Sequence, residues 1–237
     1  MESLKDKVAL VTGAGKGIGK AIAIALAKEG VNIGLIARTE KDLQEVAAEI
    51  NALGVLSIIA PADISNINAV NWAVEKIENT LGPIDILINN AGQFIPGSIH
   101  DEAEGILEQM IQTNLYSAYH LTRALLPAMI QKSAGHIFNI CSIASLNAYA
   151  NGGSYSISKF ALLGFSKNLR EELKPKGIKV TSVMPGATLS ASWDGFDIDP
   201  NRIMEVNDVA EMILAASKLS SMAVVEDIVM RPQLGDL

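Results

Sequence analysis

Tyr155 and Lys159 are the two residues of this sequence whose types and spacing most directly suggest chemistry. They stand four residues apart, and Leu162, Leu163 and Leu169 continue a helical pattern after them. Both side chains therefore fall on one helix face and can converge on one ligand. A tyrosine hydroxyl has a pKa of about 10, and an adjacent cation stabilises the phenolate and lowers that value. The pair predicts a proton-transfer site with Tyr155 as general acid and base, although Tyr-x-x-x-Lys alone is frequent by chance.

A glycine-rich turn, Thr-Gly-Ala-Gly-Lys-Gly-Ile-Gly, follows an apolar run and precedes an amphipathic helical pattern. Gly13 permits a sharp turn, Gly17 lets the backbone approach a pyrophosphate, and Gly19 lets helix and strand pack closely. Free N–H groups at the helix start would bind the phosphates. The turn predicts a dinucleotide site, which also includes its intervening residues Gly15, Lys16 and Ile18.

Arg38 indicates which dinucleotide is bound. About twenty residues after the glycine turn, proteins that bind NAD usually place an acid against the adenosine ribose, whereas an arginine accommodates the 2′-phosphate of NADP. Here Ala37 and Arg38 end a short apolar run, and Lys16 adds a second cation. The residues predict NADP(H); the alternative is that both cations are merely solvated surface charges.

Further candidate residues follow the predicted strands, where open parallel sheets bind ligands. The apolar run 84–88 leads into Asn90-Ala91-Gly92, and the run 137–141 leads into Ser142. Asp63 and Ile64 follow the strand predicted at 55–60 and are expected to contact the cofactor. Asn114 lies on an otherwise apolar helix, where its amide needs hydrogen-bond partners.

Strand and helix patterns alternate along the chain. Helices are expected at about 41–53, 67–81, 101–132, 154–174 and 206–219, with an interruption or kink near Pro127. We therefore expect an α/β fold: one doubly wound Rossmann-type domain over residues 1–237, with a parallel seven-stranded sheet and helices on both faces.

The order of these motifs resembles that of the short-chain dehydrogenase/reductase family. The family places Thr-Gly-x-x-x-Gly-x-Gly, Asn-Asn-Ala-Gly, a mid-helix asparagine, a serine thirteen residues before the tyrosine, and Tyr-x-x-x-Lys in this order, and all are present. The resemblance covers about residues 7–186. Pro185 and Gly186 look like the family's segment beside the nicotinamide, which would include Thr188, with Ser190 in place of the usual threonine.

The resemblance implies roles for four side chains. Tyr155 would donate the proton to a carbonyl oxygen, and Lys159 would lower the pKa of Tyr155 and hold the nicotinamide ribose. Ser142 would hydrogen-bond the substrate oxygen, and Asn114 would support a proton-relay water. The expected activity is reversible hydride transfer between NADP(H) and a carbonyl or secondary alcohol. No metal is proposed. The sequence does not identify the substrate, since a fold resemblance does not specify it.

Two alternatives remain. The first is a 3-oxoacyl-carrier-protein reductase; many family members, those reductases included, end with a glycine pair after the last strand, where this chain reads Met-Arg-Pro-Gln at 230–233. An acidic chain with five arginines is also poorly suited to an acidic carrier. The second alternative is a silent cofactor-sensing or scaffold protein, for which Ser142, Tyr155 and Lys159 together would have no physical need. Residues 189–199 are expected to form a mobile cover over the substrate or, equally, a surface loop.

The composition of the chain disfavours several classes of binding partner. The formal net charge of −7 and the lack of a basic run disfavour nucleic acid and anionic membrane. The single cysteine, Cys141, fits a reducing compartment, and no early segment is apolar enough for a signal peptide or membrane helix, so a cytoplasmic location is expected. The three histidines lack metal-ligand spacing. The apolar content of the two longest helical regions predicts a homo-oligomer, a tetramer or a dimer.

Two hydrolase classes are disfavoured by local sequence. A phosphate-binding loop of the nucleotide hydrolases would need glycine at Ala14 and serine or threonine at Ala21. Ser142 lacks the small-residue elbow Gly-x-Ser-x-Gly of a hydrolase nucleophile.

Overall fold

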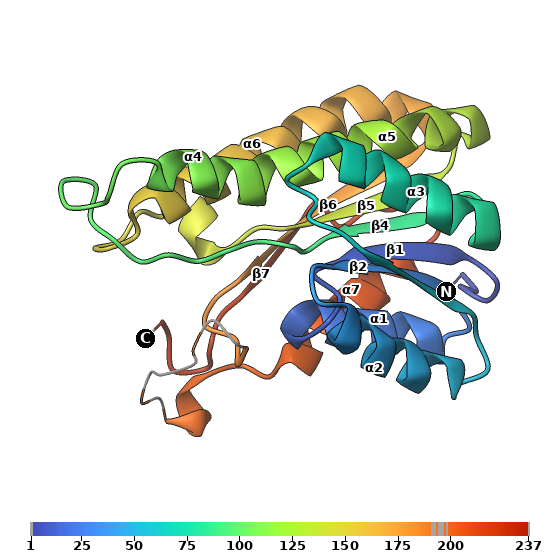
Figure 1. Cartoon of the computed structure of the whole chain (residues 1–237), viewed down its shortest axis with the longest axis horizontal. Helices are drawn as coiled ribbons and strands as arrows, with labels where there is room; N and C mark the ends of the chain where they lie inside the picture. Colours follow the sequence, from blue (N-terminus) through green and yellow to red (C-terminus); the bar gives the residue numbers. More distant parts are fainter. Residues whose placement is uncertain (1, 191–192, 194–196, 198, 237) are drawn as a thin grey trace.

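The fold is built on one parallel sheet of seven strands, and the computed structural model describes residues 2–190, 193, 197 and 199–236 (Figure 1). The strand order is β3-β2-β1-β4-β5-β6-β7. The strands are β1 (Val8–Thr12), β2 (Asn32–Ala37), β3 (Ser57–Pro61), β4 (Ile86–Asn89), β5 (Gly135–Ile140), β6 (Ile178–Pro185) and β7 (Asp227–Met230). The chain starts in the middle of the sheet, runs outward to β3, and returns to place β4 beside β1.

Helices cover both faces of this sheet (Figure 1). One layer holds α1 (Gly17–Lys28), α2 (Glu40–Asn51) and α7 (Val206–Ser217), and the other holds α3 (Ile67–Leu81), α4 (Ile106–Ile111), α5 (Ser117–Lys132) and α6 (Gly153–Leu173). Two large apolar clusters fill the spaces between sheet and layers. The expected α/β doubly wound fold is confirmed, and its order reverses between β1 and β4, where such sheets form a ligand crevice.

Local sequence accounts for these elements. Every residue of β1 and of β4 is buried, as expected for strands covered on both faces. In α3 the buried residues Val70, Ala73, Val74 and Ile77 recur at helical spacing, so one face of the helix packs on the sheet. The Asn66 side chain caps α3 by accepting hydrogen bonds from the N–H groups of residues 68 and 69.

The long helical region differs from expectation. Instead of one helix from about 101 with a break near Pro127, the chain forms α4, a π-helical turn η1 (Gln112–Tyr116) and α5. The helix continues through Pro127, which has no N–H to donate to the preceding turn. The irregularity lies instead at the wider turn that contains Asn114, and such turns are common at functional sites.

Candidate active site

A cavity of about 1080 Å³ lies at the carboxyl ends of the strands, on the crevice between the two halves of the sheet. It is lined by Ser142, Tyr155 and Lys159 and by most residues expected to bind a dinucleotide. Those residues are Gly13, Gly15, Lys16, Gly17, Ile18, Arg38, Asp63, Ile64, Asn90, Ala91, Gly92, Pro185, Gly186 and Thr188. Of the expected set, only Gly19 and Asn114 do not line it.

The glycine turn is shaped as a cradle at the start of α1. Gly13 and Gly17 have positive φ angles of 63° and 56°, which favour glycine. A Cβ on Gly19 would lie 2.3 Å from the Gly13 carbonyl oxygen, so Gly19 serves the packing of helix against strand. Within the described residues, no side chain caps α1, which leaves its first N–H groups available to an anion.

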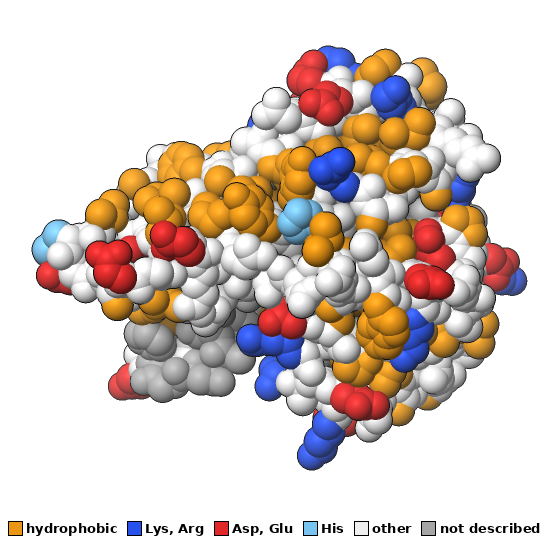
Figure 2. All heavy atoms as spheres, turned by 45° about the horizontal axis from the view of Figure 1, so that its top comes forward, with side chains coloured by type: hydrophobic (Ala, Val, Ile, Leu, Met, Phe, Trp, Pro, Cys, Tyr) orange, Lys and Arg blue, Asp and Glu red, His pale blue; other side chains and the backbone are white. Residues whose placement is uncertain are grey.

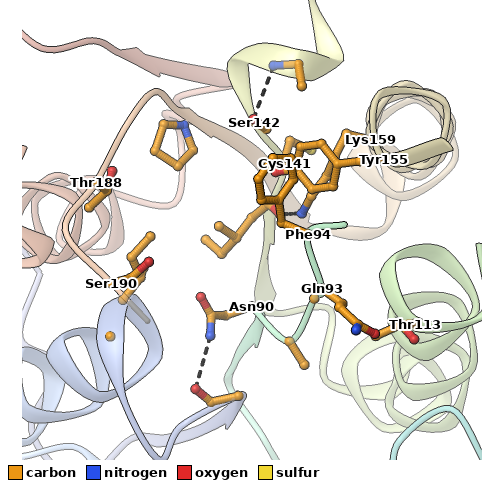
Figure 3. Close-up of a pocket in the computed structure, with 18 of the residues that line it drawn as sticks. Asn90, Gln93, Phe94, Thr113, Cys141, Ser142, Tyr155, Lys159, Thr188 and Ser190 are labelled. Atoms are coloured by element: carbon orange, nitrogen blue, oxygen red, sulfur yellow. Dashed lines mark hydrogen bonds between the residues drawn. The ribbon is translucent and has the colours of Figure 1, made fainter. Parts of the chain in front are cut away.

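Thr12 and Asn90 tie this turn to the end of β4. The Thr12 hydroxyl accepts from the backbone N–H groups of Asn90 and Ala91 at 3.0 and 2.9 Å. The Asn90 amide donates back to the Thr12 carbonyl at 2.9 Å. Its amide nitrogen is therefore committed to holding β1 and β4 together, and its place in the cavity wall is set by these bonds (Figure 3).

Ser142, Tyr155 and Lys159 meet on one side of the cavity (Figure 3). Ser142 follows β5, and helix α6 carries the other two on one face. The Lys159 ammonium lies 5.8 Å from the centre of the Tyr155 ring and donates to the Ile140 carbonyl at 2.8 Å. The Ser142 hydroxyl accepts from the Ala144 N–H at 3.1 Å.

The pKa of Tyr155 shifts in the direction opposite to that expected. Burial raises the pKa to about 12, and the hydrogen bond with Ser142 opposes that rise only in part. Burial also lowers the pKa of Lys159. The expected lowering of the Tyr155 pKa by Lys159 is wrong for the chain alone, because the ammonium turns to a carbonyl and desolvation of the phenol dominates.

Asn114 is buried behind the cavity rather than in its wall. Its amide oxygen accepts from the Gln93 N–H at 2.7 Å, and its nitrogen donates to the Gln93 carbonyl at 3.0 Å and to Ser158 at 2.9 Å. The side chain thus fixes the loop after β4 on both sides of one residue and joins it to α6. Asn114 has its hydrogen-bond partners, but its side chain does not reach the space that a ligand would fill.

The apolar cavity wall beyond Tyr155 was not predicted from the sequence. The Phe94 ring meets the Tyr155 ring edge-on, with centroids 4.8 Å apart and planes at 76°. Pro96, Tyr149 and Trp193 also line the cavity, so its substrate side is largely apolar. Phe94 comes two residues after the Asn-Asn-Ala-Gly motif, and that position is the only signal from which its role could have been read.

The opposite end of the cavity carries the charges expected near an adenosine ribose. Arg38 and Lys16 both line it, together with Thr39 and Asp42, which sequence reasoning missed. The Lys16 ammonium lies 3.3 Å from the Asp42 carboxylate. Hydrogen bonds from Ser65, assisted by the charge of Arg38, hold the pKa of Asp63 below its usual value. Arg38 is therefore the cation whose charge an adjacent acid offsets least directly.

The segment after β6 closes a further side. Thr188 is buried and its hydroxyl donates to the Gly186 carbonyl at 3.0 Å, while Ser190 and Trp193 line the cavity. The expected cover at 189–199 falls largely on residues 191, 192, 194–196 and 198, which lie outside the described residues. Across the part of the chain that is described, no three His, Cys, Asp or Glu side chains are grouped to hold a metal ion, and no helix could span a membrane.

Known proteins share this architecture. A family profile described as short chain dehydrogenase matches residues 7–199. An uncharacterized oxidoreductase of Staphylococcus aureus strain MW2 is 34% identical over 232 residues, which cover 98% of this chain and 100% of that protein.

Two solved structures are similar over nearly the whole chain. A metagenomic short-chain oxidoreductase in complex with NADP is 32% identical, with a TM-score of 0.85 and coverage of 98% of this chain and 99% of that one. A 7α-hydroxysteroid dehydrogenase in complex with NADH and 7-oxo glycochenodeoxycholic acid is 29% identical, with a TM-score of 0.88 and coverage of 99% and 96%. Similar proteins have thus been solved with either nicotinamide dinucleotide.

Proposed function

The chain belongs to the short-chain dehydrogenase/reductase family, and from that premise we propose that it is an NADP(H)-dependent carbonyl reductase. It would transfer a hydride reversibly between the nicotinamide and a carbonyl or secondary-alcohol substrate. The observation that carries this proposal is the convergence of Ser142, Tyr155 and Lys159 on a cavity whose other end is a glycine cradle.

Tyr155 is proposed as the proton donor. When bound, NADPH supplies the hydride, so the chain must supply a proton to the carbonyl oxygen. With a pKa of about 12, the Tyr155 hydroxyl carries its proton at neutral pH, and this is the proton that it would donate to the carbonyl oxygen. Ser142 would orient the same oxygen, and the Lys159 ammonium would hold the nicotinamide ribose.

NADP(H) is proposed because the residues around the cradle fit it. The uncapped start of α1 and the two positive-φ glycines suit a pyrophosphate. Arg38 supplies a charge for a 2′-phosphate, and Ala37 leaves no carboxylate at the NAD-selective position. Asp63 and Ile64 would contact the adenine end, while Pro185, Gly186 and Thr188 would contact the nicotinamide end.

Two rival functions are weaker. A 3-oxoacyl-carrier-protein reductase must dock an acidic carrier, whereas this chain has a net charge of −7 and lacks the glycine pair after β7. A silent scaffold has no need of a buried lysine that lies beside a half-buried tyrosine in a cavity. Neither rival has an observation in its favour.

The proposal is tested by mixing the protein with NADPH or NADH and a panel of ketones, quinones, pterins and 3-oxoacyl thioesters while absorbance at the nicotinamide band is followed. We expect NADPH oxidation with at least one uncharged carbonyl. Selective turnover of carrier-linked 3-oxoacyl thioesters would favour the first rival. Tight NADPH binding without any turnover would favour the scaffold.

We further propose that residues 1–237 form one domain and that the protein is cytoplasmic.

We also propose that the protein is a homo-oligomer, either a tetramer or a dimer. Figure 2 shows apolar side chains gathered in a band over the face that carries α4, α5 and α6. The exposed large apolar side chains of these helices and of η1 are Leu107, Tyr116, Tyr119, Ile130, Ile157 and Phe160. A second copy of the chain is the partner that we propose for this band.

A further inference from the structure

Helix α6, which carries Tyr155 and Lys159, begins without a cap of its own. Its first residues, Gly152 and Gly153, have no side chain that could accept a hydrogen bond, and no acid lies in its first turn. The acceptor comes from another part of the chain. Oε1 of Glu102 accepts from the Ser154 backbone N–H at 2.8 Å, and Oε2 accepts from the Ser154 hydroxyl.

The carboxylate of Glu102 lies in a space shaped around it. A Cβ added to Gly153 would lie 2.0 Å from Oε1 of Glu102, and one added to Gly97 would lie 2.8 Å from Cγ of Glu102. Gly153 also has a positive φ of 35°. Glycine at both positions lets two backbones close on this side chain, and a negative charge at a helix N-terminus is favourable.

Two more hydrogen bonds fasten the same loop to the segment before α6. The Gly97 N–H donates to the Asn151 carbonyl at 3.0 Å, and the Ser98 hydroxyl donates to the Asn151 amide oxygen at 2.7 Å. The loop between β4 and α4 is thus clamped to residues 151–154, although about fifty positions separate them in sequence.

This clamp joins the two groups that a carbonyl substrate would meet. Phe94, at the start of the clamped loop, packs edge-on against Tyr155, which directly follows Ser154 (Figure 3). Glu102 itself does not line the cavity. Resting on the proposed reductase function, we propose that Glu102 is a positioning residue that fixes the substrate wall at Phe94 relative to the Tyr155 hydroxyl.

The test compares Glu102→Ala, Glu102→Gln and the control Glu104→Ala, an exposed acid of the same loop. We expect Glu102→Ala to lower kcat/KM for the carbonyl substrate about tenfold, because small misplacements of reacting groups cost rate steeply. The dissociation constant for NADPH should stay within about twofold of the parent's, because Glu102 lies outside the cavity. Glu102→Gln should restore most of kcat/KM, since an amide can accept from the Ser154 N–H and donate to its hydroxyl.

Amide hydrogen exchange over residues 149–158 gives a readout that needs no turnover, and it should accelerate in Glu102→Ala but not in Glu104→Ala. The inference is overturned if Glu102→Ala matches Glu104→Ala in exchange or in kcat/KM. It is also overturned if NADPH binding weakens as much as kcat/KM falls. Absence of turnover in the parent would instead refute the proposed function, and exchange would still decide whether the clamp exists.

Discussion

The proposed reaction depends on a few single side chains, above all on the proton of the Tyr155 hydroxyl. The cavity collects Ser142, Tyr155 and Lys159 as their positions in the sequence suggested. The pKa of Tyr155 is raised, whereas the sequence predicted that it would be lowered. This pKa depends on the burial of the hydroxyl and on the contact of the Lys159 ammonium, which donates to the Ile140 carbonyl. Spacing specifies a helix face but neither of these quantities.

The preference between NADPH and NADH also depends on single side chains. Lys16 is paired with Asp42, so Arg38 should carry most of the discrimination in favour of a 2′-phosphate. A charge-assisted contact contributes on the order of 1.5–3 kcal/mol, or roughly ten- to over a hundredfold in affinity. We expect the parent to prefer NADPH and the double variant Ala37→Asp, Arg38→Leu to reverse or abolish that preference.

The measurement is kcat/KM with each cofactor for the parent, the double variant and the control Lys41→Leu. Lys41 is an exposed cation at the start of α2, outside the cavity, and its loss should leave the preference unchanged. If the parent has the same kcat/KM with NADH as with NADPH, then Lys16 and Arg38 are ordinary surface charges.

At the scale of elements, periodic segments were predicted well and irregular ones were not. Helix α3 has the predicted bounds, because its buried spacing and its asparagine cap are both local signals. The π-helical turn η1 and the clamp at Glu102 have no such signal. They depend on contacts with Gln93 and Ser154, which are distant in sequence from their partners.

His136 on β5 makes the free energy of unfolding depend on pH in a predictable direction. The Thr181 hydroxyl donates to the Val225 carbonyl, so it accepts from Nε2 of His136, which is neutral and buried. Burial lowers the pKa of His136 to about 3. The unfolded chain binds a proton there below a pH of about 6.5 and the folded chain does not, so stability falls as pH drops from 6.5 toward 3.

The expected loss is about 2 kcal/mol at a pH of about 5 relative to neutrality. Urea unfolding at both pH values measures it for the parent and for His136→Gln, in which an amide can still donate to Thr181. The parent should lose more stability than the variant on acidification, since only the parent titrates at this position. Equal losses in the two proteins would contradict the assignment.

For the whole molecule, the alternating strand and helix patterns predicted the parallel doubly wound sheet, whereas assembly depends on a surface that periodicity does not define. The apolar band over α4, α5 and α6 predicts a homo-oligomer. Light scattering at micromolar concentration should give a mass of two or four times 25.1 kDa. Phe160→Glu, within the band, should reduce that mass, because it places a charge in the interface.

Met222→Glu is the matched control, because Met222 is also exposed but lies outside these helices. It should leave the mass unchanged. A parent that scatters only as a 25.1 kDa species would refute the proposed assembly.

The central claim is that Tyr155 transfers the proton in an NADPH-dependent reduction, and the most direct measurement is turnover by Tyr155→Phe with NADPH affinity determined in parallel. Removing only the hydroxyl should lower kcat by about 10²–10⁴-fold while NADPH binding stays near that of the parent. Tyr116→Phe, a loss of the same hydroxyl at an exposed site on η1, should leave both unchanged. If Tyr155→Phe keeps more than about half of the parent's activity, Tyr155 is not the proton donor.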